Sequence, residues 1–143
     1  MRFSNSVSIR RPVHDVFEYV ADLEHAPSWN YALVETRKTS DGPIGVGTTY
    51  VQLRSIPAPS QETLRVSRFE PDRLFEVDGD LGPFSGRLTY EFASDDGATL
   101  LTNTVDLEPS GLARLAAPLA AGRIRESVAA NLAVLKDLLE RST

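Results

Sequence analysis

Residues 84–108 have the sequence FSGRLTYEFASDDGATLLTNTVDLE, which contains the clearest strand pattern in the chain. Hydrophobic and polar residues alternate on both sides of Asp95-Asp96-Gly97, a sequence typical of a tight turn between antiparallel strands. We therefore predict strands over residues 84–93 and 99–108, joined as a hairpin. The face of this hairpin that is expected to point inward carries Gly86, Leu88, Tyr90, Phe92, Leu101, Asn103, Val105 and Leu107.

The same pattern of short strands extends from this hairpin toward the N-terminus. Runs rich in Val, Thr, Phe, Tyr and Leu are separated by turn residues, and they predict strands over residues 34–39, 48–56, 61–69 and 74–78. Short connections between consecutive strands favour an antiparallel meander. Alternation over Phe3–Ile9 predicts one more strand, which brings the expected sheet to seven strands.

Helical patterns flank these strands. Apolar residues at helical spacing from Val13 to Leu23 follow Pro12 and predict a helix. Residues 22–27 are either a break or a short second helix, which Pro27-Ser28-Trp29 ends. A long helix is predicted over residues 122–141, and Pro118 and Gly122 predict either a kink in it or a separate short helix over residues 112–118. One face of the long helix carries Ile124, Val128, Leu132, Leu135 and Leu139.

This order of elements indicates a fold with a cavity. An antiparallel sheet with one apolar face needs a cover, and the long C-terminal helix is the obvious one. A twisted sheet that curls around one helix rarely closes completely, and the remaining gap would be concave and apolar. We expect one α+β domain over residues 1–143, with a curved seven-stranded antiparallel sheet wrapped around the C-terminal helix.

Five segments of the sequence also carry a family resemblance. They are RPVHDVF (11–17), DLEHAPSWN (22–30), GVGTTY (45–50), VSRFEP (66–71) and NLAVLKDLLE (131–140). In this order and spacing they resemble the SRPBCC superfamily of START-like proteins, and most closely its bacterial polyketide cyclase/dehydratase-like members. The resemblance covers nearly the whole chain and implies a helix-grip fold with two short helices after the first strand. Because the superfamily includes lipid carriers, hormone receptors and cyclases, the resemblance does not specify a reaction.

Several side chains are expected to line the cavity. Alternation along the strands, the apolar helix face and, for Tyr50, the resemblance give Tyr50, Phe75, Leu88, Tyr90, Phe92, Asn103 and Val128 as candidate ligand-binding residues. Trp29 is a further candidate, because it follows the short second helix and its ring can wall the mouth of the cavity. Tyr90 and Asn103 are polar residues in apolar rows, so they are also the candidates for a catalytic role. The alternatives are that these two bond to neighbouring groups and that Trp29 is a plug in the core.

Composition excludes several other chemistries. The chain has no cysteine, which excludes disulfide scaffolds, cysteine-based zinc sites and thiol catalysis. We expect no metal, because the two histidines, His14 and His25, have no companion ligands and are expected at the surface. Glu62, Asp78 and Asp80 are expected on a solvated face. With a net charge of −5, the chain is not expected to bind nucleic acid.

Three functions remain open, and the third, an interaction module of the stress-protein or co-chaperone type, is the weakest. The first is binding of a small hydrophobic molecule, such as a lipid or a polyketide, in the cavity. The second is a polyketide cyclase/dehydratase that works without a cofactor by positioning a poly-ketone and moving protons. No segment is long and apolar enough for a membrane span, and we expect a cytoplasmic monomer or homodimer.

Overall fold

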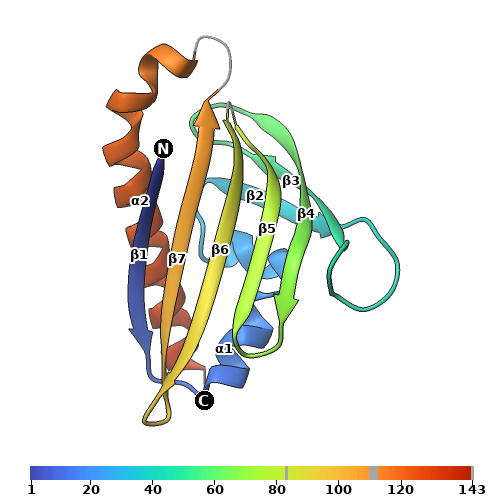
Figure 1. The fold of residues 1–143 in the computed structure, drawn as a ribbon, viewed down its shortest axis with the longest axis vertical. Helices are drawn as coiled ribbons and strands as arrows, with labels where there is room; N and C mark the ends of the chain where they lie inside the picture. Colours follow the sequence, from blue (N-terminus) through green and yellow to red (C-terminus); the bar gives the residue numbers. More distant parts are fainter. Residues whose placement is uncertain (83, 110–112, 143) are drawn as a thin grey trace.

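The computed structural model describes residues 1–82, 84–109 and 113–142, and it shows a seven-stranded antiparallel sheet that curves beside one long helix (Figure 1). The elements, in chain order, are β1 (Arg2–Ile9), α1 (Val13–Val20), the 3-10 helix η1 (Leu23–Ser28), β2 (Leu33–Lys38), β3 (Thr49–Arg54), β4 (Ser60–Glu70), β5 (Leu74–Leu81), β6 (Phe84–Asp95), β7 (Ala98–Pro109) and α2 (Ala113–Arg141). The predicted α+β helix-grip arrangement is confirmed.

The strands form the predicted meander. Their order in the sheet is β1-β7-β6-β5-β4-β3-β2, so β2 to β7 each pair with their neighbours in sequence and β1 is added at the β7 edge. In the turn between β6 and β7, Asp96 and Gly97 have φ angles of 49° and 83°. Positive φ at both central residues is what a type I′ turn requires, and this turn matches the twist of antiparallel strands.

The strand β5 is longer than the sequence pattern predicted: it continues past Asp78 and ends at Leu81. Gly79 on β5 lies opposite Gly86 on β6. A Cβ atom on Gly79 would lie 2.2 Å from the Thr63 carbonyl oxygen, and one on Gly86 would lie 2.6 Å from the Leu107 side chain. Neighbouring groups therefore pack closely at both glycines. Residues 79–81, which were expected in the connection before the next strand, belong to β5 instead.

The segment after the first helix, which was expected to be either a break or a short second helix, is a short helix. Leu23–Ser28 form a 3-10 helix, in which Asp22 Oδ1 accepts a hydrogen bond from the Glu24 backbone N–H at 3.0 Å. Pro27 lies inside this helix, which ends one residue later. At the other end of the chain, α2 is a single helix through Pro118 and Gly122, not two helices. The expected boundaries at Pro83 and at residues 110–112 lie outside the described residues.

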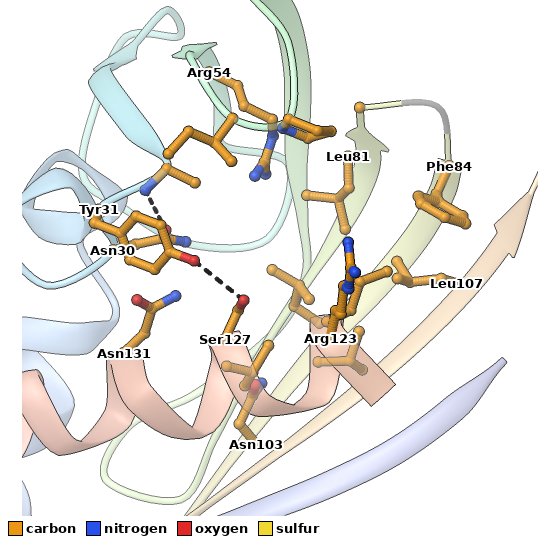
Figure 2. A pocket seen from close by; sticks show the side chains of 18 of the residues that line it. Asn30, Tyr31, Arg54, Leu81, Phe84, Asn103, Leu107, Arg123, Ser127 and Asn131 are labelled. Carbon is orange, nitrogen blue, oxygen red and sulfur yellow. Dashed lines mark hydrogen bonds between the residues drawn. The ribbon is translucent and has the colours of Figure 1, made fainter. Parts of the chain in front are cut away.

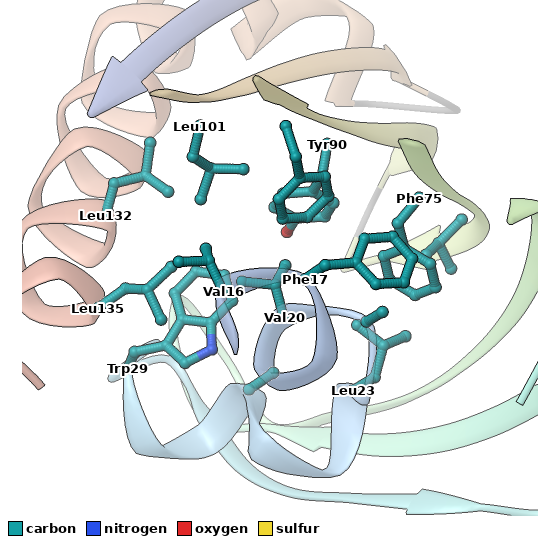
Figure 3. Close-up of a cluster of buried hydrophobic side chains, with 14 of the residues drawn as sticks. Val16, Phe17, Val20, Leu23, Trp29, Phe75, Tyr90, Leu101, Leu132 and Leu135 are labelled. Atoms are coloured by element: carbon teal, nitrogen blue, oxygen red, sulfur yellow. The ribbon is translucent and has the colours of Figure 1, made fainter. Parts of the chain in front are cut away.

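The hydrophobic core occupies the end of the sheet that α1 and η1 cover, here called the closed end (Figure 3). The α1 side chains of Val16, Phe17 and Val20 are buried there. The C-terminal half of α2 adds Leu132, Leu135 and Leu139. The preceding turns of α2, around Ile124 and Val128, are only half-buried. Within the described residues, no helix is both long and apolar enough to cross a membrane.

Candidate functional site: a cavity between the sheet and α2

A cavity of about 930 Å³ lies between the sheet and α2, beyond the closed end (Figure 2). Its lining comes from the segment after η1, the end of β3, the β5–β6 hairpin, β7 and the middle of α2. Those residues are Trp29, Asn30, Tyr31, Ala32, Arg54, Ile56, Pro57, Leu81, Gly82, Phe84, Leu88, Tyr90, Asn103, Val105, Leu107, Ala120, Arg123, Ile124, Ser127, Val128 and Asn131. Most are apolar, as is typical of sites for small hydrophobic molecules.

Five of the candidate ligand-binding residues line this cavity: Trp29, Leu88, Tyr90, Asn103 and Val128. Tyr90 and Asn103 are partners across β6 and β7, so their side chains emerge side by side from the concave face of the sheet. Trp29 packs against Tyr90 edge to face, with ring centroids 6.4 Å apart. Trp29 also belongs to the hydrophobic core, so it is both a part of the cavity wall and a plug in the core.

Tyr50, Phe75 and Phe92 point to the same concave face but lie in the core of the closed end. Phe75 is fully buried and stacks on Tyr90 at a centroid distance of 6.1 Å. Phe92 packs against Phe17 of α1, with centroids 5.0 Å apart. Burial raises the pKa of Tyr50 to about 12, so its hydroxyl stays protonated. The packing of α1 therefore separates inward-facing core residues from inward-facing cavity residues.

The two candidate catalytic residues are held in a largely apolar environment. Asn103 Nδ2 donates a hydrogen bond to the Thr89 carbonyl oxygen at 3.2 Å, which satisfies one donor of this buried amide. Burial raises the pKa of Tyr90 above that of a free tyrosine. At neutral pH the Tyr90 hydroxyl is therefore a hydrogen-bond donor rather than a base.

A buried ion pair at the cavity was not predicted from the sequence. Arg54 lines the cavity, and its Nε donates to Glu62 Oε2 at 2.8 Å. The Glu62 side chain is 1% exposed, so the expectation of a solvated Glu62 is wrong. Glu62 alternates inward with Leu64 and Val66 on β4, and this period-2 pattern was the available signal. By contrast, Asp80 is exposed, and Asp78 forms an ion pair with Arg87 at 2.7 Å on a partly exposed surface.

One contact joins two sides of the cavity. The Tyr31 hydroxyl, from the segment between η1 and β2, lies 3.1 Å from the Ser127 hydroxyl of α2 (Figure 2). Tyr31 itself is 59% exposed. An exposed hydrogen bond of this kind is worth only about 1 kcal/mol. The two sides are therefore linked by a contact that a ligand can break at small cost.

Neither histidine lines the cavity. His14 is exposed, and its two ring nitrogens lie 3.0 Å from Asp72 and 3.2 Å from Glu18, which raises its pKa. His25 is half-buried rather than fully exposed, because its ring stacks on Tyr19 at a centroid distance of 4.3 Å. His25 Nδ1 also lies 2.9 Å from the Tyr19 carbonyl oxygen. The cavity wall thus draws its polar groups from amides, hydroxyls, an indole and two arginines.

Solved structures with the same fold cover nearly the whole chain. A protein from Thermus thermophilus matches with a TM-score of 0.80 at 16% identity, over 100% of both chains. The Zhui aromatase/cyclase from a Streptomyces species matches with a TM-score of 0.83 at 14% identity, over 99% of this chain and 94% of that one. A START superfamily protein from Mycobacterium smegmatis matches with a TM-score of 0.77 at 17% identity, over 99% of both chains. At these identities the likeness establishes the fold alone.

Sequence comparison gives the family. No match is found among curated proteins. A family model described as polyketide cyclase / dehydrase and lipid transport matches residues 1–140. This match, together with the helix-grip fold around an apolar cavity, shows that the chain belongs to the polyketide cyclase/dehydrase and lipid transport family.

Proposed function

We propose that this protein binds a small hydrophobic molecule, such as a lipid or a polyketide, in the cavity between the sheet and α2. The observation that carries the proposal is the cavity itself, whose volume of about 930 Å³ lies within the range of roughly 300–1,000 Å³ that is usual for ligand sites. Family membership supports it, because the family description includes lipid transport.

The apolar groups of the wall come from both sides of the cavity. Leu88 and Val105 lie on the sheet, and Ile124 and Val128 face them from α2. An apolar ligand between these surfaces would remove their apolar area from water, worth about 25 cal/mol per Å² before the cost of association. Much of the driving force for binding would thus be hydrophobic.

A pair of matched substitutions on α2 tests this proposal. Val128→Trp places a large ring in the cavity, whereas Val134→Trp makes the same change at a position that is 46% exposed. We expect Val128→Trp to weaken binding of fatty acids and aromatic polyketides by about tenfold or more, and Val134→Trp to leave it unchanged. Native mass spectrometry and isothermal titration with a ligand panel would measure both. Equal affinity in the two variants, or no binding of any panel member to the wild type, would contradict the proposal.

A second candidate function is a cofactor-independent cyclase/dehydratase. The observation that favours it is the adjacency of Tyr90 and Asn103 in the cavity wall, where a neutral hydroxyl and an amide could polarise a ligand carbonyl. However, none of the described lining residues is a carboxylate or a histidine, so this wall offers no general base of the usual kind. For this reason the binding function takes first place.

Turnover of a poly-ketone analogue separates the two candidates. If the chain is a cyclase that uses Tyr90 as a proton donor, Tyr90→Phe should lower the rate by about a hundredfold while the fold is retained. Tyr19→Phe, which removes a hydroxyl outside the cavity, is the matched control. An undetectable wild-type rate, or the same rate in both variants, would exclude this role for Tyr90.

A further inference from the structure

The charged side chains of the cavity wall all have the same sign. Arg54 and Arg123 are the charged residues among the described lining residues, and no aspartate or glutamate accompanies them there. The chain as a whole has a net charge of −5, so this positive wall is not a consequence of overall composition. Positive charge concentrated in a low-dielectric cleft favours an anionic group on the ligand.

The guanidinium group of Arg54 lies at the cavity wall, where its terminal amino groups can contact a ligand. It is the last residue of β3, its side chain is 15% exposed, and Figure 2 shows that side chain reaching into the cavity region. Its Nε atom binds Glu62, and no described residue accepts a hydrogen bond from its two Nη groups. A guanidinium has five N–H donors in a planar fork that fits a carboxylate. Most of that fork is therefore available to a ligand.

Glu62 holds Arg54 in place from behind the wall. Its Oε1 accepts from Gln52 Nε2 at 2.7 Å, and its Oε2 accepts from Arg54 Nε at 2.8 Å and from Ser60 Oγ at 3.3 Å. The Gly82 backbone N–H also donates to Oε2. A buried carboxylate needs such partners, and these contacts fix its position. Because Glu62 does not line the cavity, a ligand would meet the guanidinium and not the carboxylate.

Building on the proposed function, we propose that the ligand is an apolar carboxylate. Its head group binds Arg54 and Arg123, and its apolar part lies against Leu88, Val105 and Val128. The charge balance favours a monoanion: Glu62 neutralises Arg54, so the excess positive charge of the wall is that of Arg123 alone. A phosphate dianion would leave uncompensated negative charge in the site.

The test compares two probes of equal chain length, dodecanoic acid and dodecanol, by isothermal titration. We expect Arg54→Gln to weaken acid binding by about tenfold or more and to change alcohol binding by less than about threefold. Arg123→Gln should produce a smaller loss for the acid, and it leaves no buried charge unpaired because Arg123 is exposed. Glu62→Gln should raise the affinity for the acid relative to the alcohol, because Arg54 is then no longer neutralised. Arg37→Gln, at an arginine whose side chain is 68% exposed on β2, is the control.

The outcomes separate this inference from the function on which it rests. If both probes bind but their affinity ratio is the same in the wild type, Arg123→Gln and Glu62→Gln, the carboxylate assignment is overturned and the binding function stands. If neither probe nor any other hydrophobic molecule binds the wild type, both are overturned. Should Arg54→Gln unfold because Glu62 is left unpaired, the neutral double variant Arg54→Met/Glu62→Gln replaces it, with the same expected loss of acid preference.

Discussion

Tyr90 marks the boundary between the two parts of the interior. On one side its ring stacks on Phe75, at a centroid distance of 6.1 Å, and this side is filled with core residues. On the other side it lines the cavity together with Asn103. A single inward-facing row on β6 therefore contributes Phe92 to the core and Leu88 to the cavity wall, with Tyr90 in between.

The core residues on one side of this boundary are expected to stabilise the fold, and Phe75→Ala tests this at a single residue. Phe75 is fully buried, and its removal would leave a void beside Phe69 and Tyr90. We expect a loss of about 3–5 kcal/mol in the free energy of unfolding, measured by urea denaturation. Leu100→Ala, at a position that is 42% exposed, should cost less than about 1 kcal/mol. Equal costs in the two variants would show that the closed end is not tightly packed.

The helix α2 has a different task in each half. Its C-terminal half buries Leu132, Leu135 and Leu139 in the core, whereas Ala120 to Asn131 contribute cavity wall. Glu140 anchors the packed half to the end of β1: its Oε2 accepts from the Arg10 backbone N–H at 2.8 Å and from Lys136 Nζ at 2.5 Å. Arg10 Nη2 donates to Oε1 at 3.2 Å. In the described part of the chain, the cavity-lining half has fewer such attachments. They are the contact between the Tyr31 and Ser127 hydroxyls and the hydrogen bond that Asn5 Nδ2 donates to the Arg125 carbonyl oxygen.

The anchor at Glu140 predicts a dependence of stability on pH. The hydrogen bond from Lys136, with those from Arg10, lowers the pKa of Glu140 to about 2 in the folded chain. Since the folded pKa lies below the unfolded one, the contribution of Glu140 is complete above the unfolded value and is lost as the pH falls toward 2. We expect Glu140→Gln to lower the thermal midpoint at pH 7 and to differ progressively less from the wild type between pH 4.5 and pH 2. A difference that stays constant over this range would contradict the anchoring role.

At the scale of the whole molecule, the sheet is closed at one end and open at the other. Helices α1 and η1 lie over the concave face of the sheet at the closed end (Figure 1), and their buried side chains belong to the core. The cavity lies beyond them, along Ala120 to Asn131 of α2. The strands β6 and β7 contribute Phe92 and Leu101 to the core of the closed end, and the same two strands contribute Leu88, Tyr90, Asn103 and Val105 to the cavity wall. The cavity wall is thus separated from most of the packing that stabilises the fold.

The parts of the fold that could be predicted from the sequence are those set by strand alternation and turn residues. Alternation over residues 84–108 and the Asp96-Gly97 turn predicted the central hairpin, and the side-chain period of two gave the inward rows correctly on β6 and β7. Glu62 escaped prediction because a charged residue is rarely buried, and its partners Gln52 and Arg54 come from another strand. Only the pairing of β3 with β4 brings these three side chains together.

By itself, the sequence determined the order of elements, the antiparallel meander and the faces of β6 and β7 that turn inward, because these depend on short-range periodicity and turn chemistry. Only the tertiary structure decided which inward residues are core and which are cavity wall. That division depends on how far α1 and η1 extend over the sheet, and it places Tyr50, Phe75 and Phe92 on one side and Leu88, Asn103 and Val128 on the other. The charge of the wall was decided in the same way, since Arg54 and Arg123 lie far apart in sequence and face one cavity only when α2 packs across the sheet.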